Sequence, residues 1–152
     1  MSLNPSIRRI LLIDDDIDDY IFFRDALEMV DPSVELLHLP SASRVQTDDT
    51  WKTPDILFLD INIPDSNGFD VLKSIRGKGF SLPIVMYSTA SNPVYVERAY
   101  QEGASLYFPK PDSMRALEES LRRLLGFNWS DPEMVKENYK QHNSYRVFSV
   151  KD

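Results

Sequence analysis

Each of four short apolar runs in this sequence leads into polar residues that are suited to phosphate chemistry. These are a carboxylate cluster, a single carboxylate, a hydroxyl and an ammonium: Asp14, Asp15 and Asp16; Asp60; Ser88; and Lys110. Such runs predict strands buried on both faces, and hence parallel strands with helices on either side. The carboxyl ends of parallel strands lie along one edge, where ligands bind. We therefore expect these side chains to meet, in a set that could hold a divalent cation and accept a phosphoryl group.

The first run is followed by a dense acidic group, which comprises Asp14, Asp15, Asp16, Asp18 and Asp19. One interpretation is helix capping, because carboxylates are favourable near the positive end of a helix dipole. The other is a Mg²⁺ site, because a bound cation relieves the repulsion among them. An EF-hand fits poorly, since loop position six is Asp19 rather than Gly and position twelve is Asp25 rather than Glu.

Asp60 is the most informative single residue. A carboxylate that closes an apolar strand is costly to desolvate unless it is paired or bound to a metal. The alternative is a cap for the following loop. Lys110 lies between Pro109 and Pro111, and the alternative for it is an ordinary surface lysine. Ser88 indicates a phosphate site only in combination with Asp60 and Lys110.

The elements that must position these residues alternate between strand-like and helix-like patterns. Helices are expected between Asp16 and Asp31, around residues 69–75, at 94–102 closed by Gly103, and at 114–124 between Ser113 and Gly126. Further strands are expected at residues 34–39 and 104–108, residues 62–68 form a loop, and residues 41–51 are ambiguous. This β-α alternation predicts a parallel sheet with right-handed crossovers.

Four segments together resemble the receiver domain of two-component response regulators: residues 10–16, 56–68, 83–89 and 103–111. The resemblance covers roughly residues 7–125, and residues 59–68 are similar to the phosphoacceptor loop of that family, Pro64 and Gly68 included. It implies an α/β, flavodoxin-like, doubly wound sheet of five parallel strands in the order 2-1-3-4-5, with helices on both faces.

The resemblance also implies a role for each site residue. Asp60 would be the phosphoacceptor, receiving its phosphoryl group from a histidine kinase or a histidine phosphotransfer protein. Mg²⁺ would be held by Asp14, Asp15, Asp60 and the backbone carbonyl of Asn62, with Asp16 just outside the metal shell. Lys110 and Ser88 would contact the phosphoryl oxygens.

A switch follows from the same resemblance. Tyr107 would be the aromatic residue that swings inward from the surface when Ser88 moves. The output face would then comprise the fourth helix, the last strand and the fifth helix, near Tyr100, Tyr107 and Lys110. A downstream protein is the expected target, and formation of a homodimer stays open.

Residues 126–152 form an extension outside the receiver-like part. The Ser130–Glu133 spacing is that of a capping box and predicts a short helix that ends near residue 141. Residues 145–150 are apolar, and many aromatic residues in the extension favour docking over disorder. The extension is too short for a helix-turn-helix output domain.

Composition bounds the function. The net charge of −7 argues against direct DNA binding, and the absence of cysteine suits a reducing cytoplasm. No apolar stretch approaches the ~20 residues of a membrane span, and no signal-peptide core opens the sequence. We expect a cytoplasmic, stand-alone phosphoacceptor with self-dephosphorylation rather than an enzyme.

The alternative is a phosphohydrolase that forms an aspartyl-phosphate. Phosphatases of the haloacid dehalogenase type have Thr or Val after an Asp-x-Asp motif, whereas Ile17 stands there in this sequence. A nucleotide-binding domain is a weaker alternative, because the sequence has no Gly-rich phosphate loop.

Overall fold

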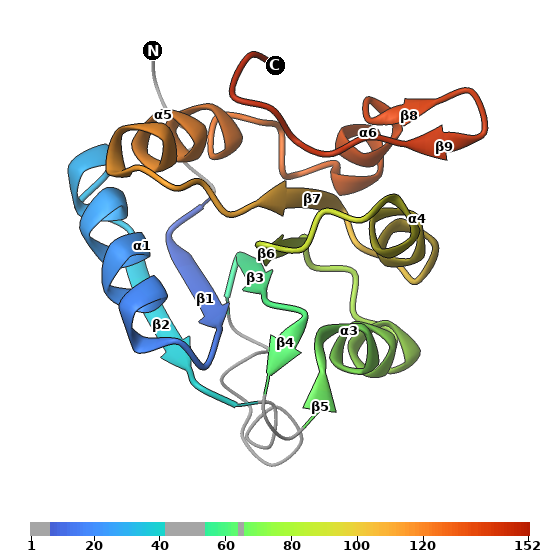
Figure 1. Cartoon of the computed structure of the whole chain (residues 1–152), viewed down its shortest axis with the longest axis horizontal. Helices are drawn as coiled ribbons and strands as arrows, with labels where there is room; N and C mark the ends of the chain where they lie inside the picture. Colours follow the sequence, from blue (N-terminus) through green and yellow to red (C-terminus); the bar gives the residue numbers. More distant parts are fainter. Residues whose placement is uncertain (1–6, 42–53, 64–65) are drawn as a thin grey trace.

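A five-stranded parallel sheet forms the centre of the computed structural model, which describes residues 7–41, 54–63 and 66–152. The strands are β1 (Arg9–Ile13), β2 (Glu35–Leu39), β3 (Ile56–Leu59), β6 (Ile84–Ser88) and β7 (Leu106–Pro109). Their order is β2-β1-β3-β6-β7 (Figure 1), which confirms the predicted doubly wound fold class. Apart from Ser41, the ambiguous segment at residues 41–51 lies outside the described residues.

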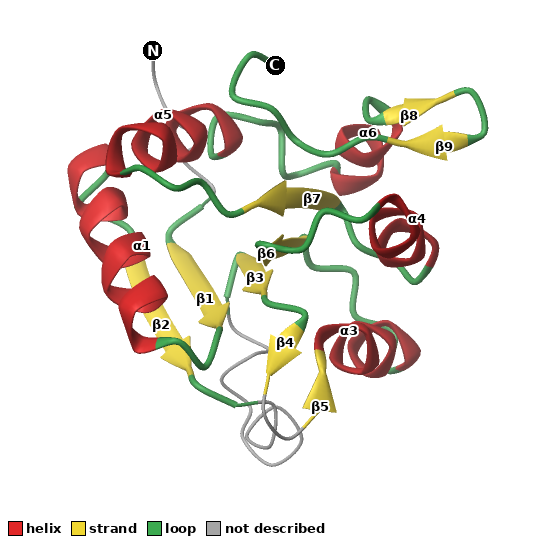
Figure 2. Cartoon of the chain, in the orientation of Figure 1, coloured by secondary structure: helices red, strands yellow, loops and turns green. Residues whose placement is uncertain are grey.

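Helices cover both faces of this sheet (Figure 2). On one face lie α1 (Ile17–Val30) and α5 (Met114–Leu124), and on the other lie α3 (Gly68–Gly77) and α4 (Pro93–Gln101). Each begins after a residue whose side-chain oxygen accepts a backbone N–H of the first turn. These capping residues are Asp16, Asn67, Asn92 and Ser113.

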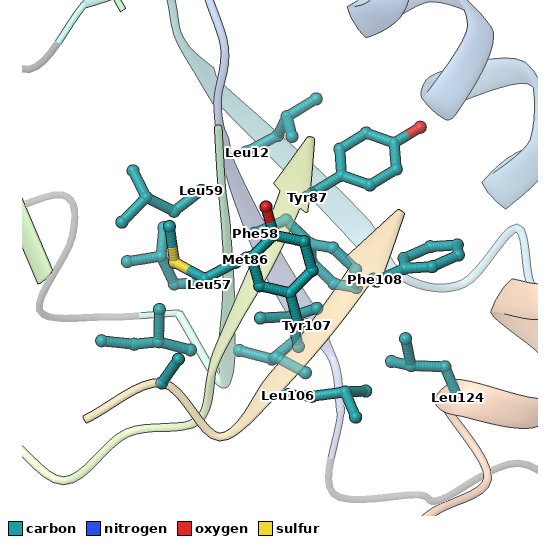
Figure 3. Close-up of a cluster of buried hydrophobic side chains, with 14 of the residues drawn as sticks. Leu12, Leu57, Phe58, Leu59, Met86, Tyr87, Leu106, Tyr107, Phe108 and Leu124 are labelled. Atoms are coloured by element: carbon teal, nitrogen blue, oxygen red, sulfur yellow. The ribbon is translucent and has the colours of Figure 1, made fainter. Parts of the chain in front are cut away.

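The core between the sheet and the α1/α5 layer is aromatic (Figure 3). The ring of Tyr87 on β6 lies 6.1 Å from that of Phe58 on β3 and 5.3 Å from that of Phe108 on β7. Burial of these rings fixes the register of neighbouring strands, because a shift of one residue would turn them to the other face. The polar residues at the strand ends are thereby aligned along one edge.

The loop predicted at residues 62–68 contains more structure than expected. β4 (Asn62–Ile63) and β5 (Ser66–Asn67) form a short antiparallel pair, and α3 begins immediately at Gly68. The Gly68 N–H donates to the carbonyl of Ile61 at 2.8 Å. The loop that follows Asp60 is therefore tied to the start of α3.

The extension contains α6 (Pro132–Glu137) and a hairpin of β8 (Lys140–Gln141) and β9 (Ser144–Tyr145). The prediction that Ser130 caps this helix is wrong: Asp131 accepts the N–H of Met134, while Ser130 donates its hydroxyl to Asn128. The helix also ends at Glu137, before residue 141, and is followed by the hairpin, whose turn includes His142 with a φ of 55°. None of the helices described has the length and apolarity needed to cross a membrane.

Candidate functional site

Three strand ends bring Asp14, Asp60 and Lys110 together. The Lys110 ammonium lies 3.0 Å from Oδ2 of Asp60 and 2.7 Å from Oδ2 of Asp14. Asp14 and Asp60 are both buried, and the Lys110 side chain is only 7% exposed. The contact with Asp14 is an ion pair that lacks hydrogen-bond geometry, so electrostatic attraction rather than a directed bond holds these two groups.

Asp19 is a fourth member of this cluster; the sequence predicts it only as part of the acidic group after β1, without a role of its own. Its Oδ2 accepts a hydrogen bond of 2.7 Å from Lys110. Burial lowers the pKa of Lys110, but its contacts with the carboxylates of Asp14 and Asp19 outweigh burial and raise that pKa overall. A signal was present: a helix that starts directly after β1 places its first turn over the sheet edge.

Asp14 is fully buried, and burial raises the pKa of its carboxyl to about 6, against the lowering effect of Lys110. Its Oδ1 accepts the N–H of Asp16 at 3.0 Å. Its backbone carbonyl lies 2.7 Å from Nε2 of His38, whose ring stacks on Tyr20 at 4.2 Å. The position of Asp14 is therefore fixed from both its backbone and its side chain.

Asp14, Asp15 and Asp60 form a group that could hold a metal ion. One carboxylate oxygen from each lies within 4.8 Å of the others. With Asp19 nearby, these carboxylates outnumber the Lys110 ammonium, so a divalent cation would offset charge that the described residues leave uncompensated. Asn62 donates its N–H to Oδ1 of Asp60 at 3.3 Å, which ties the backbone after β3 to this carboxylate.

The remaining acidic residues, Asp16 and Asp18, lie at the start of α1. Asp16 caps α1 by accepting the N–H groups of Asp18 and Asp19, as the capping interpretation expects. Asp18 is exposed.

Ser88 and Tyr107 are linked through the loop after β6. Ser88 Oγ accepts the N–H of Ala90 at 3.3 Å, and the Tyr107 hydroxyl donates to the carbonyl of Ala90 at 2.5 Å. Tyr107 and Tyr100 are both fully buried, so neither ring lies on the surface expected for them. Burial raises the pKa of Tyr107 to about 12, which keeps the hydroxyl protonated as a donor at neutral pH.

Residues 10–122 match a family model described as the response regulator receiver domain. The chain belongs to the response regulator receiver family. The transcriptional regulatory protein CpxR of Escherichia coli K12 is 29% identical to this receiver over 133 residues, which cover 87% of this chain and 56% of CpxR. The chain thus spans about half the length of that curated relative.

Solved receivers share the fold. A crystal structure of the phosphorylated cyanobacterial phytochrome response regulator RcpA superposes with a TM-score of 0.70 at 21% identity, covering 82% of this chain and 94% of that chain. The Mn²⁺-bound form of response regulator Rcp1 gives 0.67 at 22% identity, covering 80% and 96%. These likenesses establish the fold of this receiver.

Proposed function

We propose that this chain is a phosphoacceptor receiver, at residues 7–125, with an extension at residues 126–152. Asp60 accepts a phosphoryl group from a histidine kinase or a histidine phosphotransfer protein, and a downstream protein reads the result in the cytoplasm. The observation that carries this proposal is the Lys110 ammonium, buried and 3.0 Å from Oδ2 of Asp60 beside the carboxylate of Asp14. Phosphoryl transfer asks a protein mainly for such positioning and charge neutralisation.

The donor set fits Mg²⁺. Burial raises the pKa of Asp14, which means that its ionised form is destabilised in the folded chain, and a bound cation would stabilise that form. We propose Asp14, Asp15 and Asp60 as ligands, with the backbone carbonyl of Asn62. When bound, the cation neutralises carboxylate charge and polarises the phosphoryl oxygens.

In the transfer step, a carboxylate oxygen of Asp60 attacks the phosphorus of a phosphohistidine. The P–N bond breaks, its electron pair returns to the imidazole nitrogen, and a P–O bond forms. Lys110 offers a point charge to the phosphoryl oxygens of the acyl phosphate. Ser88 Oγ accepts a bond from Ala90, so its own proton is left to donate to the same oxygens.

Mass spectrometry after treatment with acetyl phosphate and Mg²⁺ tests this function. We expect one added phosphate in the wild type and in Asp70→Asn, an exposed carboxylate on α3, but none in Asp60→Asn. An unchanged adduct in Asp60→Asn would refute the assignment. Multiple-turnover hydrolysis of simple phosphate esters would favour the phosphohydrolase alternative instead.

A further inference from the structure

Residues 139–152, called the strap here, run back over the outer edge of β7, the last strand of the sheet (Figure 1). The N–H of Phe148 donates to the carbonyl of Tyr107 at 2.7 Å. On the same edge, the Tyr107 N–H donates to the hydroxyl of Tyr100, which itself donates to the carbonyl of Arg146 at 3.0 Å. The strap therefore supplies hydrogen-bond partners to the backbone of β7, as a neighbouring strand would. One of these partners is indirect, because the Tyr100 hydroxyl lies between the Tyr107 N–H and the Arg146 carbonyl.

Aromatic side chains of the strap pack on the elements at both sides of β7. The ring of Tyr145 stacks on Tyr100 of α4 at 4.4 Å and 13°, and its N–H donates to Glu97. The ring of Phe148 lies 5.3 Å from Phe108 of β7 and is buried. Aromatic pairs at these ring distances stabilise a fold by more than the burial of their apolar area alone.

Polar groups close the far end of the strap on α5. The Asp152 carboxylate accepts hydrogen bonds from Tyr139 at 2.6 Å and Arg146 at 2.9 Å, and the Asp152 carbonyl accepts one from Arg123 of α5. Burial would raise the pKa of Asp152, but these bonds outweigh it and lower that pKa. The strap is thus held by α4, β7 and α5 together.

The strap acts on Tyr107 through the backbone of β7. Tyr107 is 0% exposed; its carbonyl accepts the Phe148 N–H, and its N–H donates to the Tyr100 hydroxyl that also bonds Arg146. Movement of the strap would break the bond between Phe148 and Tyr107 and would remove the partner of the Tyr100 hydroxyl. Strap docking and the buried position of Tyr107 therefore favour each other.

The strap is more exposed than the core, because only Tyr139 and Phe148 among its residues are buried. An open pocket of about 310 Å³ lies between it and α6, lined by Phe127, Met134, Val135, Tyr139, Arg146 and Asp152. Segments with few buried residues open at lower free energy than a core does. Opening of the strap alone is thus a small change compared with unfolding of the sheet.

We propose that the strap is a built-in ligand of the α4–β7–α5 face, that it holds Tyr107 in its buried position, and that a protein partner reaches this face only by displacing it. This deepens the proposed function, on which its link to phosphorylation rests. Ser88 Oγ and the Tyr107 hydroxyl both bond Ala90, so a phosphoryl group that engages Ser88 would favour the buried position of Tyr107 and would thereby tighten the strap.

Amide hydrogen exchange on the full chain tests the resting part of this proposal. Tyr145→Ala removes the stack on Tyr100 without touching Tyr107. We expect exchange to rise about tenfold at residues 139–152 and also at 104–110, with β1 and β3 unchanged. Tyr95→Ala, an exposed aromatic on the same helix, should change neither region. Faster exchange at residues 139–152 with unchanged exchange at residues 104–110 would overturn the coupling between strap docking and the position of Tyr107.

Arg123→Gln is the milder second variant, since it loses only the bond to Asp152. It should accelerate both regions about threefold even if Tyr145→Ala does not fold. Equal exchange in Arg123→Gln and wild type, at both regions, would overturn the proposal.

Beryllofluoride with Mg²⁺ tests the link to Asp60. We expect the strap of the wild type to exchange a few-fold more slowly, and that of Asp60→Asn to keep its resting rate. Faster exchange of the wild-type strap would overturn the inferred direction. A lack of phosphorylation at Asp60 would refute the proposed function, but the hydrogen-exchange result for the unphosphorylated chain would still test the role of the strap.

Discussion

At the scale of single residues, the site is dominated by the cost of burying carboxylates. Asp14 has no exposed surface, and its pKa is raised to about 6. A carboxyl whose pKa is higher in the folded than in the unfolded chain binds its proton more tightly when folded. This group therefore stabilises the fold less and less as the pH rises from about 4 to about 6.

We predict that Asp14→Asn stabilises the metal-free chain at pH 7 by on the order of 1–3 kcal/mol, since the neutral amide avoids that cost. The gain should shrink towards pH 4, where the wild-type carboxyl is protonated. Urea unfolding in chelator at both pH values measures it. Mg²⁺ should stabilise the wild type and not the variant, and equal stabilisation of both would contradict the metal assignment.

Asp19 competes with Asp60 and its phosphoryl group for Lys110. In Asp19→Asn, Lys110 loses one of its carboxylate partners, so we predict phosphorylation by acetyl phosphate about 5-fold faster, which corresponds to about 1 kcal/mol of barrier. Asp18→Asn is the matched control, because it removes the same charge from the same helical turn without a contact to Lys110. Equal acceleration in both variants would show a general charge effect instead.

At the scale of elements, the close approach of α3 to the strand that carries Asp60 depends on Gly68. A Cβ at this position would overlap the carbonyl oxygen of Asp60 and would lie 2.8 Å from Cα of Ile61. Both are backbone atoms, which cannot rotate away as a side chain can. The loop after Asp60 must therefore move if residue 68 gains a side chain.

We predict that Gly68→Ala lowers the stability by about 1–3 kcal/mol and slows phosphorylation of Asp60 more than tenfold, because the acceptor oxygen is displaced. Gly77→Ala is the control: a Cβ there meets nothing within 4 Å, and the change should stabilise by about 0.5–1 kcal/mol. Chemical denaturation and acetyl phosphate kinetics give the two readouts. Normal kinetics in a destabilised Gly68→Ala would separate folding from catalytic positioning.

Local patterns were enough to predict the sheet and the residues at its edge. Each apolar run is short and bounded, so Asp60 and Lys110 had to follow strand ends. A helix that starts directly after β1 indicates that Asp19 lies near this edge, but its contact with Lys110 also depends on the exact packing of α1 on the sheet, which spacing along the chain does not encode. The β8–β9 hairpin was missed because its polar residues show no alternation, and its turn depends on His142 at positive φ.

At the scale of the whole molecule, the extension and the receiver share one hydrophobic core. Trp129 is 4% exposed, and its indole N–H donates to the carbonyl of Leu124 at the end of α5 at 2.9 Å. Residues of the extension thus extend the core cluster that begins in the sheet.

We predict that in Trp51→Phe, where Trp129 remains as the fluorescent reporter, urea unfolding followed by fluorescence coincides with that followed by far-ultraviolet circular dichroism. Coincidence is expected because Trp129 is anchored to α5, and one cooperative unit gives one transition. A fluorescence midpoint at lower urea would show that the extension unfolds on its own. Trp129→Phe added to Trp51→Phe should remove the tryptophan fluorescence signal while keeping the dichroism midpoint within a few tenths of a molar.

The covered edge of β7 also bears on how copies of this chain behave in a crowded solution. An uncovered edge strand presents unpaired N–H and carbonyl groups that template pairing with another chain. Here the edge carries Leu106, Tyr107 and Phe108, a run of high β-propensity without charge. The two hydrogen bonds that cap Tyr107 thus protect this edge against pairing with another copy, and a chain whose edge stayed open would present it as a template for aggregation.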